Sequence, residues 1–178
     1  MIFRFYLLIL SSCILGSCSK DSAESAIDFG PNGGFQYRTA QNINNGGDDT
    51  DWLADGTWNA REKQLFANLN LSLDGAQTNR LWYASVYPNP SLVVNGFSFM
   101  ASTSQNNPAP AGSHLAYVIV DKNYRELQRG DLPATRNLIT TTFPANTLAT
   151  GALYRLYYVS YIPGQQVNFR SHGDIKVE

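Results

Sequence analysis

The sequence predicts a mainly β fold: an antiparallel β-sandwich of about seven strands with one short helix near its N-terminus. Short runs rich in β-branched and aromatic residues recur from residue 69 to the C-terminus, and turn-forming residues separate them. No helical pattern alternates with these runs, which argues against a βα repeat. The composition agrees, because 12% of the 178 residues are aromatic and only 15% are charged, as suits an extracellular β-domain.

The first eighteen residues have the features of a secretory leader. Arg4 precedes an almost wholly apolar run, Phe5–Leu15, which is too short to span a bilayer as a permanent helix. The LGSC motif at 15–18 resembles the lipobox of bacterial lipoproteins. This resemblance implies that residues 1–17 are a signal peptide and that Cys18 receives the lipid. An LSSC motif at 10–13, an ordinary secreted protein and an uncleaved anchor are the alternatives.

The two cysteines, Cys13 and Cys18, both lie in this leader. Processing at Cys18 leaves a mature domain without a disulfide, so its stability depends on its apolar core. Residues 18–50 are rich in Ser, Asp, Asn and Gly and predict a flexible tether, with an N-terminal strand near Phe35–Thr39 as the alternative. We expect the folded body over residues 51–178. The predicted location is the cell envelope, with a lipid anchor in the outer membrane, on either its periplasmic or its surface side.

One helix is predicted near residues 57–69. Its apolar residues fall on one face at helical spacing, while charged residues point elsewhere. Asn59 and Glu62 have the spacing of a capping box, which would start the helix. We expect the apolar face to cover a sheet or to close one end of the domain. The residues of this face are Trp58, Leu65, Phe66 and Leu69.

The strands follow the helix, separated by turns rich in Pro, Asn and Gly. The stretch Tyr154–Tyr161 has aromatic residues on both of its faces. This pattern predicts a central strand covered on both sides, by the opposite sheet and by the helix or the tether. The predicted strands are Leu69–Leu73, Arg80–Tyr87, Leu92–Met100, Leu115–Asp121, Leu138–Phe143, Leu153–Ile162 and Val167–Val177, the last broken at Gly173.

Three motifs in the C-terminal half point to a family. They are YPNPS at 87–91, VIVDKN at 118–123 and LATGALYRL at 148–156. With these motifs, the chain from Tyr87 onward resembles the immunoglobulin-like C-terminal sorting domains of type IX secretion substrates. The resemblance implies an immunoglobulin-like sandwich and, as a further reading, a role in type IX export. Tyr124 departs from the glycine usual in that family, and a rigid turn between two strands also explains the YPNP motif.

A calcium site is one candidate for the acidic residues before the helix. Asp51, Asp55 and Glu62 fall at positions 1, 5 and 12 of a calcium-loop pattern, with Gly56 at position 6. Position 3 is Leu53, which has no ligating atom. The alternative is a helix cap preceded by a linker.

No catalytic arrangement is predicted. His114 and His172 are the two histidines, and no Gly-x-Ser-x-Gly elbow accompanies them. Neither a resident metal nor a cofactor is expected, and we predict that the protein is not an enzyme. The net charge of −1 and the lack of a basic stripe argue against nucleic-acid binding.

Two functional hypotheses follow. The first is a lipid-anchored, non-catalytic domain that serves as an accessory or interaction subunit, with the membrane and an envelope protein as its partners. The second is a cell-surface glycan-binding module that stacks sugar rings on exposed aromatic side chains. Its candidates are Trp52, Trp58, Trp82 and Tyr83, and burial of the tryptophans in the core is the alternative.

Overall fold

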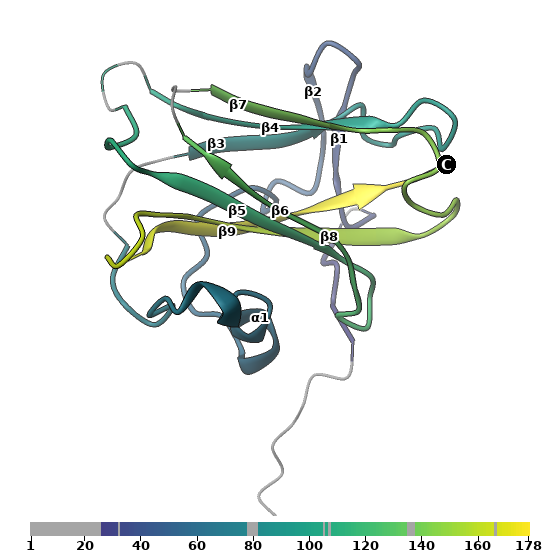
Figure 1. Cartoon of the computed structure of the whole chain (residues 1–178). Coiled ribbons are helices and arrows are strands. Elements are labelled where there is room, and N and C mark those ends of the chain that lie inside the picture. The colour runs from purple at the N-terminus through teal and green to yellow at the C-terminus, as the bar shows by residue number, and fades with distance from the viewer. Residues whose placement is uncertain are drawn as a thin grey trace, which may run out of the picture.

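The computed structural model describes residues 26–31, 33–77, 82–104, 106, 108–134, 138–165 and 167–178. Two antiparallel sheets pack face to face, which confirms the predicted β-sandwich (Figure 1). The three-stranded sheet has the order β3-β4-β7 and the four-stranded sheet the order β6-β5-β8-β9. The strands are β3 (Trp82–Tyr87), β4 (Phe97–Thr103), β5 (His114–Val120), β6 (Glu126–Pro133), β7 (Leu138–Phe143), β8 (Leu153–Tyr161) and β9 (Val167–Lys176).

The connections make the sandwich immunoglobulin-like, as expected. The chain crosses from one sheet to the other between β4 and β5, between β6 and β7, and between β7 and β8. At the last crossing the hydroxyl of Tyr154 accepts the N–H of Ala149 at 3.0 Å and contacts the carbonyl oxygen of Ala149 at 3.2 Å. This is the tyrosine corner of such sandwiches, which pins the loop before β8.

Both faces of the four-stranded sheet are covered. Along β8, Leu156 and Tyr158 point into the core between the two sheets, whereas Tyr157 and Val159 point into a second core on the outer side. All four are fully buried. The prediction that β8 is a central strand with two covered faces is therefore confirmed.

The helical segment covers that outer side, below the four-stranded sheet in Figure 1. It consists of α1 (Ala60–Gln64) followed by the 3-10 turn η1 (Ala67–Leu69). The predicted capping box is present: the side chain of Asn59 accepts the N–H of Glu62 at 3.0 Å, and the Glu62 carboxylate accepts the N–H of Asn59 at 2.7 Å. Helical hydrogen bonding ends sooner than predicted, because Phe66 turns out of the helix to reach the core.

Residues 26–50 are not a free tether over most of their length, which corrects that part of the prediction. β1 (Gln36–Arg38) and β2 (Asn44–Gly47) form a hairpin, and the side chains of Ile27 and Phe35 are buried. The alternative of a docked strand near Phe35–Thr39 fits this segment. The sequence did not distinguish this hairpin from a linker, because turns and short hairpins are rich in the same Asn and Gly residues.

Four strand predictions differ from the structure. The predicted run Leu92–Met100 is a strand only from Phe97 onward, and that strand extends to Thr103. The run Leu69–Leu73 forms no strand, because it ends the 3-10 turn and then anchors the loop with buried Leu73. Strand β6 was not predicted, since its mostly exposed, charged sequence gives little apolar alternation. Strand β9 runs through Gly173 without a break. Of the predicted run Arg80–Tyr87, the first two residues lie outside the described part.

Candidate functional surface

The Tyr87–Pro90 motif joins three parts of the fold. Asn89 is buried, and its amide nitrogen donates to the carbonyl oxygens of Gln36 at 3.0 Å and Asp174 at 2.9 Å. Its amide oxygen accepts the N–H of Lys176 at 2.9 Å. The motif therefore ties the β1–β2 hairpin to the end of β9. This supports the interpretation of the motif as a rigid structural turn.

The calcium candidates are not brought together. The two carboxylate oxygens of Asp51 accept the N–H groups of Gln36 and Asp174 at 3.0 and 3.1 Å. The carboxylate of Asp55 contacts Trp58 Nε1 at 2.6 Å and His172 Nδ1 at 2.8 Å. The Glu62 carboxylate completes the helix cap and accepts the hydroxyl of Tyr157 at 3.0 Å. Across the described residues, no group of three or more His, Cys, Asp or Glu is placed to hold a metal ion.

A buried charged cluster lies where the N-terminal segment meets β9. The guanidinium of Arg155 donates two hydrogen bonds to the carboxylate of Asp174, at 2.6 and 2.7 Å. Burial, together with the carboxylate of Asp174, raises the pKa of Asp51 to about 8, although two backbone N–H bonds oppose the shift. Burial likewise raises the pKa of Asp174 to about 6, against the lowering effect of Arg155. All of these groups bond to the fold itself, which gives the cluster a structural role.

The two histidines each pair with a carboxylate. His114 Nδ1 lies 3.0 Å from Asp131, which also accepts the hydroxyl of Tyr161 at 2.6 Å. His172 pairs with Asp55 through the contact given above. Within the described part of the chain, neither imidazole hydrogen-bonds to a hydroxyl nucleophile, so no Ser-His-Asp arrangement is assembled there.

The tryptophans proposed for glycan stacking are core residues. Trp52, Trp58 and Trp82 are all buried. Trp52 stacks on Phe99, and Trp58 stacks on Phe66. Burial removes all three as platforms for a sugar ring, which corrects that set of candidates. Tyr83 alone of the four is exposed, at 60%.

Tyr83 belongs to an apolar patch on the outer face of the β3-β4-β7 sheet. The strand register places Tyr83 and Leu138 on either side of Ser102, and Leu138 is 54% exposed. Next along β4 on the same face is Met100, whose Sδ lies 3.7 Å from the side-chain nitrogen of Asn42 in the hairpin. Ile43, beside Asn42, is 59% exposed. We call this the outer patch, formed by Ile43, Tyr83, Met100 and Leu138. Sequence alternation alone could place Tyr83 and Leu138 on one face of their strands, but not beside each other.

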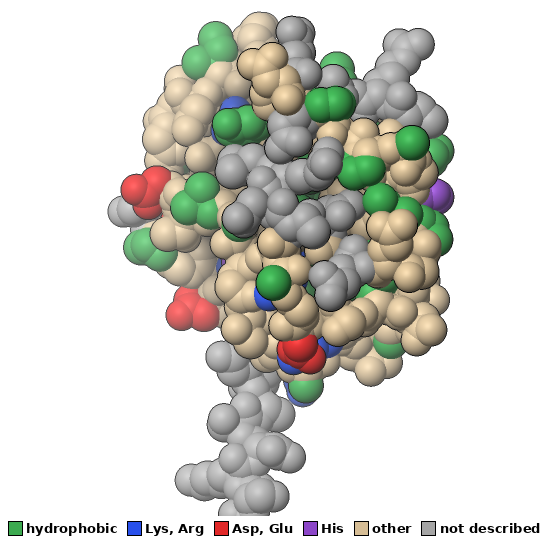
Figure 2. Space-filling view, turned by 90° about the vertical axis from the view of Figure 1, so that its left-hand side faces the viewer, with side chains coloured by type: hydrophobic (Ala, Val, Ile, Leu, Met, Phe, Trp, Pro, Cys, Tyr) green, Lys and Arg blue, Asp and Glu red, His purple; other side chains and the backbone are tan. Residues whose placement is uncertain are grey.

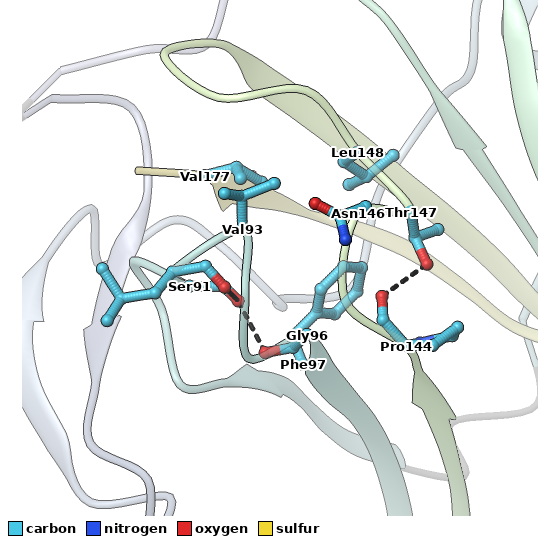
Figure 3. A pocket seen from close by; sticks show the side chains of 10 residues that line it. Ser91, Val93, Gly96, Phe97, Pro144, Asn146, Thr147, Leu148 and Val177 are labelled. Carbon is cyan, nitrogen blue, oxygen red and sulfur yellow. Dashed lines mark hydrogen bonds between the residues drawn. The ribbon is translucent and has the colours of Figure 1, made fainter.

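The small hollow in Figure 3 is a gap in the packing rather than a binding site. It lies between the loop after Ser91, the loop at 144–148 and Val177. Its volume is about 10 Å³, which leaves room for one water molecule at most. Two of its polar side chains are already bonded, since Ser91 Oγ donates to the carbonyl of Gly96 at 2.7 Å and Thr147 Oγ1 to that of Pro144 at 2.6 Å.

Two larger, shallow grooves flank the turn between β5 and β6. The first has a volume of about 510 Å³, with Phe29 and Leu153 in its wall. The second, about 420 Å³, is lined by Arg61, Leu65 and Tyr124 among others. Asn123 borders both. These volumes are those of small-molecule sites, but the grooves lack the deep apolar enclosure of such sites.

The end of the sandwich seen in Figure 2 carries hydrophobic side chains singly or in small groups among polar ones. No cluster of charged side chains is visible there among the described residues. Among the helices of the described part, none is long and apolar enough to span a membrane. Cys18 and the rest of the predicted leader lie outside the described residues.

Comparisons with known proteins add little. No family model matches the chain, and no curated protein matches it. Among solved structures, an FMN-binding beta-glucuronidase from Facaelibacterium prausnitzii L2-6 is similar over 54% of this chain and 15% of its own length, with 15% identity and a TM-score of 0.37. So low a score carries no argument about function.

Proposed function

We propose that this protein is a lipid-anchored, non-catalytic domain of the cell envelope that binds a protein partner through the outer patch. The patch carries the proposal, because Tyr83 and Leu138 are exposed on an uncharged sheet face, with half-buried Met100 between their strands and exposed Ile43 in the neighbouring hairpin. Exposed apolar side chains gathered in one region of a surface mark interaction sites. The anchor is assigned to Cys18 from the LGSC motif, and the predicted location is the outer membrane.

The use of the polar groups supports a non-catalytic role. Asp51, Asp55, Glu62 and His172 carry chemistry that enzymes use, but each is bonded to another part of the fold. Such groups position loops and a helix rather than a substrate. An interaction domain needs a stable surface but no reactive centre. The outer face of the β3-β4-β7 sheet is such a surface.

The anchor is tested by fractionating cells that express the Cys18→Ala variant. We expect the wild-type chain in the membrane fraction, labelled by a palmitate analogue, and the variant unlabelled and released. The matched control is Cys13→Ala, which we expect to behave as wild type because residues 1–17 are removed. Membrane retention and labelling of Cys18→Ala would refute the anchor.

The partner is tested by placing a photo-crosslinking amino acid at Ser102, between Tyr83 and Leu138. We expect one crosslinked species of defined mass in intact cells, which disappears when Tyr83→Ser and Leu138→Ser are combined. The control position is Leu127 on β6, which is also exposed but lies in the other sheet. The same species from both positions, or none from Ser102, would count against the patch.

The other two functional hypotheses, glycan binding and type IX export, receive less support. The glycan hypothesis retains Tyr83 from its original candidates, and one ring is a poor platform for a saccharide. The type IX reading stays a prediction based on the YPNP and LATGALYRL motifs. Its test is the secretion of a reporter protein fused to the N-terminal side of Tyr87.

A further inference from the structure

The described chain begins against the turn between β5 and β6. The N–H of Ile27 donates to the carbonyl oxygen of Lys122 at 2.7 Å, and its side chain is buried in the second core. Arg155 donates to the carbonyl oxygen of Asp28 at 2.9 Å, and its guanidinium lies 5.3 Å from the centre of the Phe29 ring. The first described segment is thus fixed to one surface of the domain.

Helix α1 belongs to the same surface. The side-chain nitrogen of Asn59, at its start, donates to the hydroxyl of Tyr124 at 3.2 Å, and the guanidinium of Arg61 lies 5.7 Å from the centre of the Tyr124 ring. We call this surface the N-terminal face, formed by residues 27–29, the turn 121–125 and α1. Figure 1 shows α1 and the start of the described chain on one side of the four-stranded sheet, with β3, β4 and β7 on the other.

The length of the preceding chain limits where this face can lie. Ala26 comes eight residues after Cys18, and a fully extended chain of that length spans at most about 29 Å. A domain of this size is roughly 40 Å across. A lipid at Cys18 therefore holds the N-terminal face nearer to the membrane than the outer patch, whereas a tether of about thirty residues would impose no such order.

The exposed cations of the N-terminal face suit lipid phosphates, and the exposed carboxylate on the same face, that of Asp28, accepts the N–H of Gly30. Arg61 and Lys122 are exposed, and among the described residues neither forms an ion pair with an acidic side chain. Arg125 and Arg129 are also exposed but pair with Asp121 and Glu126. Each of the two unpaired cations borders one of the shallow grooves that flank the turn. An ammonium or guanidinium group at such a rim attracts an anionic lipid surface.

We propose that the N-terminal face rests on the membrane that holds the anchor, with Arg61 and Lys122 bound to lipid phosphate groups, and that the outer patch consequently points away from the bilayer. This orientation rests on the proposed lipid anchor at Cys18. It extends the proposed function by stating which side of the domain meets the lipid and which side meets a protein partner. The short connection to Cys18 brings the N-terminal face close to the membrane. The unpaired cations then hold the face there by binding lipid phosphates.

The test measures which face lies near the headgroups. Lipidated protein is purified with a single introduced cysteine, labelled with a fluorescent donor and reconstituted in vesicles of phosphatidylethanolamine and phosphatidylglycerol that carry a headgroup acceptor. The labelled positions are Asn123→Cys on the N-terminal face and Ser102→Cys in the outer patch. No other free thiol interferes, because both natural cysteines lie in the leader and Cys18 carries the lipid. We expect strong energy transfer from position 123 and weak transfer from position 102.

The cations are tested by combining Arg61→Gln and Lys122→Gln. We expect the ratio of the two transfer signals to fall, because each cation removed weakens the equilibrium constant for the membrane-bound orientation by about fivefold. The matched control combines Thr140→Glu and Thr142→Glu, two exposed positions on the outer face of β7, which change the net charge by the same amount. The control ratio should equal that of the wild type.

The outcomes separate the orientation from the anchor. If the protein is lipidated and membrane-bound but positions 123 and 102 give equal transfer, the orientation is wrong and the anchor stands. If the double glutamine variant keeps the wild-type ratio, phosphate binding by Arg61 and Lys122 is refuted. If purified protein carries no lipid at Cys18, the anchor fails, and the orientation that rests on it fails as well.

Discussion

The indole ring of Trp52 lies directly over the backbone of Gly173 in β9. Trp52 also donates its backbone N–H to the carbonyl oxygen of His172 at 2.9 Å, so the segment around it lines the edge of β9. A β-carbon at position 173 would overlap the ring. The glycine is therefore required for close packing of a side chain, and its presence inside a strand follows from that contact.

Gly173→Ala is accordingly expected to destabilise the domain by about 1–3 kcal/mol, because the added methyl group displaces a buried ring. The free energy of unfolding is measured by urea titration. Gly56→Ala is the control, since a β-carbon there meets no atom within 4 Å and the backbone is not left-handed. Equal effects of the two substitutions would show that the Trp52 contact does not constrain position 173.

Sequence patterns found the parts of this fold that depend on local periodicity. The capping box of Asn59 and Glu62 and the alternation of Leu138–Phe143 are short-range signals, and the structure contains both features. Gly173 led to a wrong prediction of a strand break. A glycine is needed there because of its contact with Trp52, which lies more than a hundred positions earlier in the sequence. Strand β6 was missed for a related reason: an edge strand with charged side chains needs only one partner and little burial.

The arrangement of the candidate site residues depends even more on contacts between residues that are far apart in the sequence. The spacing of Asp51, Asp55 and Glu62 fitted a calcium loop, yet each carboxylate bonds to a residue far along the chain. The exposure of Tyr83 and the burial of Trp82 follow from strand alternation, but which face is buried depends on the opposite sheet. Single-sequence patterns contain no information on such pairings, so they identified candidate residues without showing which ones meet.

Asn89 is predicted to be one of the most sensitive polar positions. Its side chain makes three hydrogen bonds to backbone groups of two other segments. Asn89→Ala leaves those buried groups without partners, at a cost of about 1–3 kcal/mol for each unsatisfied group. Asn89→Asp is also expected to destabilise the fold, because a carboxylate cannot donate to the carbonyls of Gln36 and Asp174. Exposed Asn45→Ala is the control for thermal unfolding, and a similar loss there would contradict the assignment.

The tyrosine corner gives a more conservative test. Tyr154→Phe removes only the hydroxyl that bonds to Ala149, so we expect a loss of about 1–2 kcal/mol in the free energy of unfolding. Tyr83→Phe removes a hydroxyl from an exposed ring and should change stability by less than about 0.5 kcal/mol. Denaturant unfolding of both variants at one pH measures the difference. Identical midpoints would mean that the loop before β8 is held by other contacts.

The buried carboxyl of Asp51 predicts a pH dependence of unusual sign. Its pKa is raised to about 8 by burial and by Asp174, so the folded state holds a proton that the unfolded state releases near pH 4. The stability that this proton contributes is complete below about pH 4 and is lost as the pH rises to about 8. Asp174, with a pKa of about 6, adds to the loss only in the lower part of that interval.

Between pH 6 and 8 the free energy of unfolding should therefore fall with a slope of up to about 1.4 kcal/mol per pH unit. Asp51→Asn removes the titrating group and is expected to flatten this slope, at the cost of some stability at pH 6, because an amide oxygen can accept from only one of the Gln36 and Asp174 N–H groups. Urea unfolding at pH 6, 7 and 8 measures both effects. Asp49→Asn is the control, since Asp49 is exposed and its loss should leave the slope unchanged. A wild-type protein whose stability does not fall over this interval would show that Asp51 is already ionised in the fold, held by its two backbone N–H bonds.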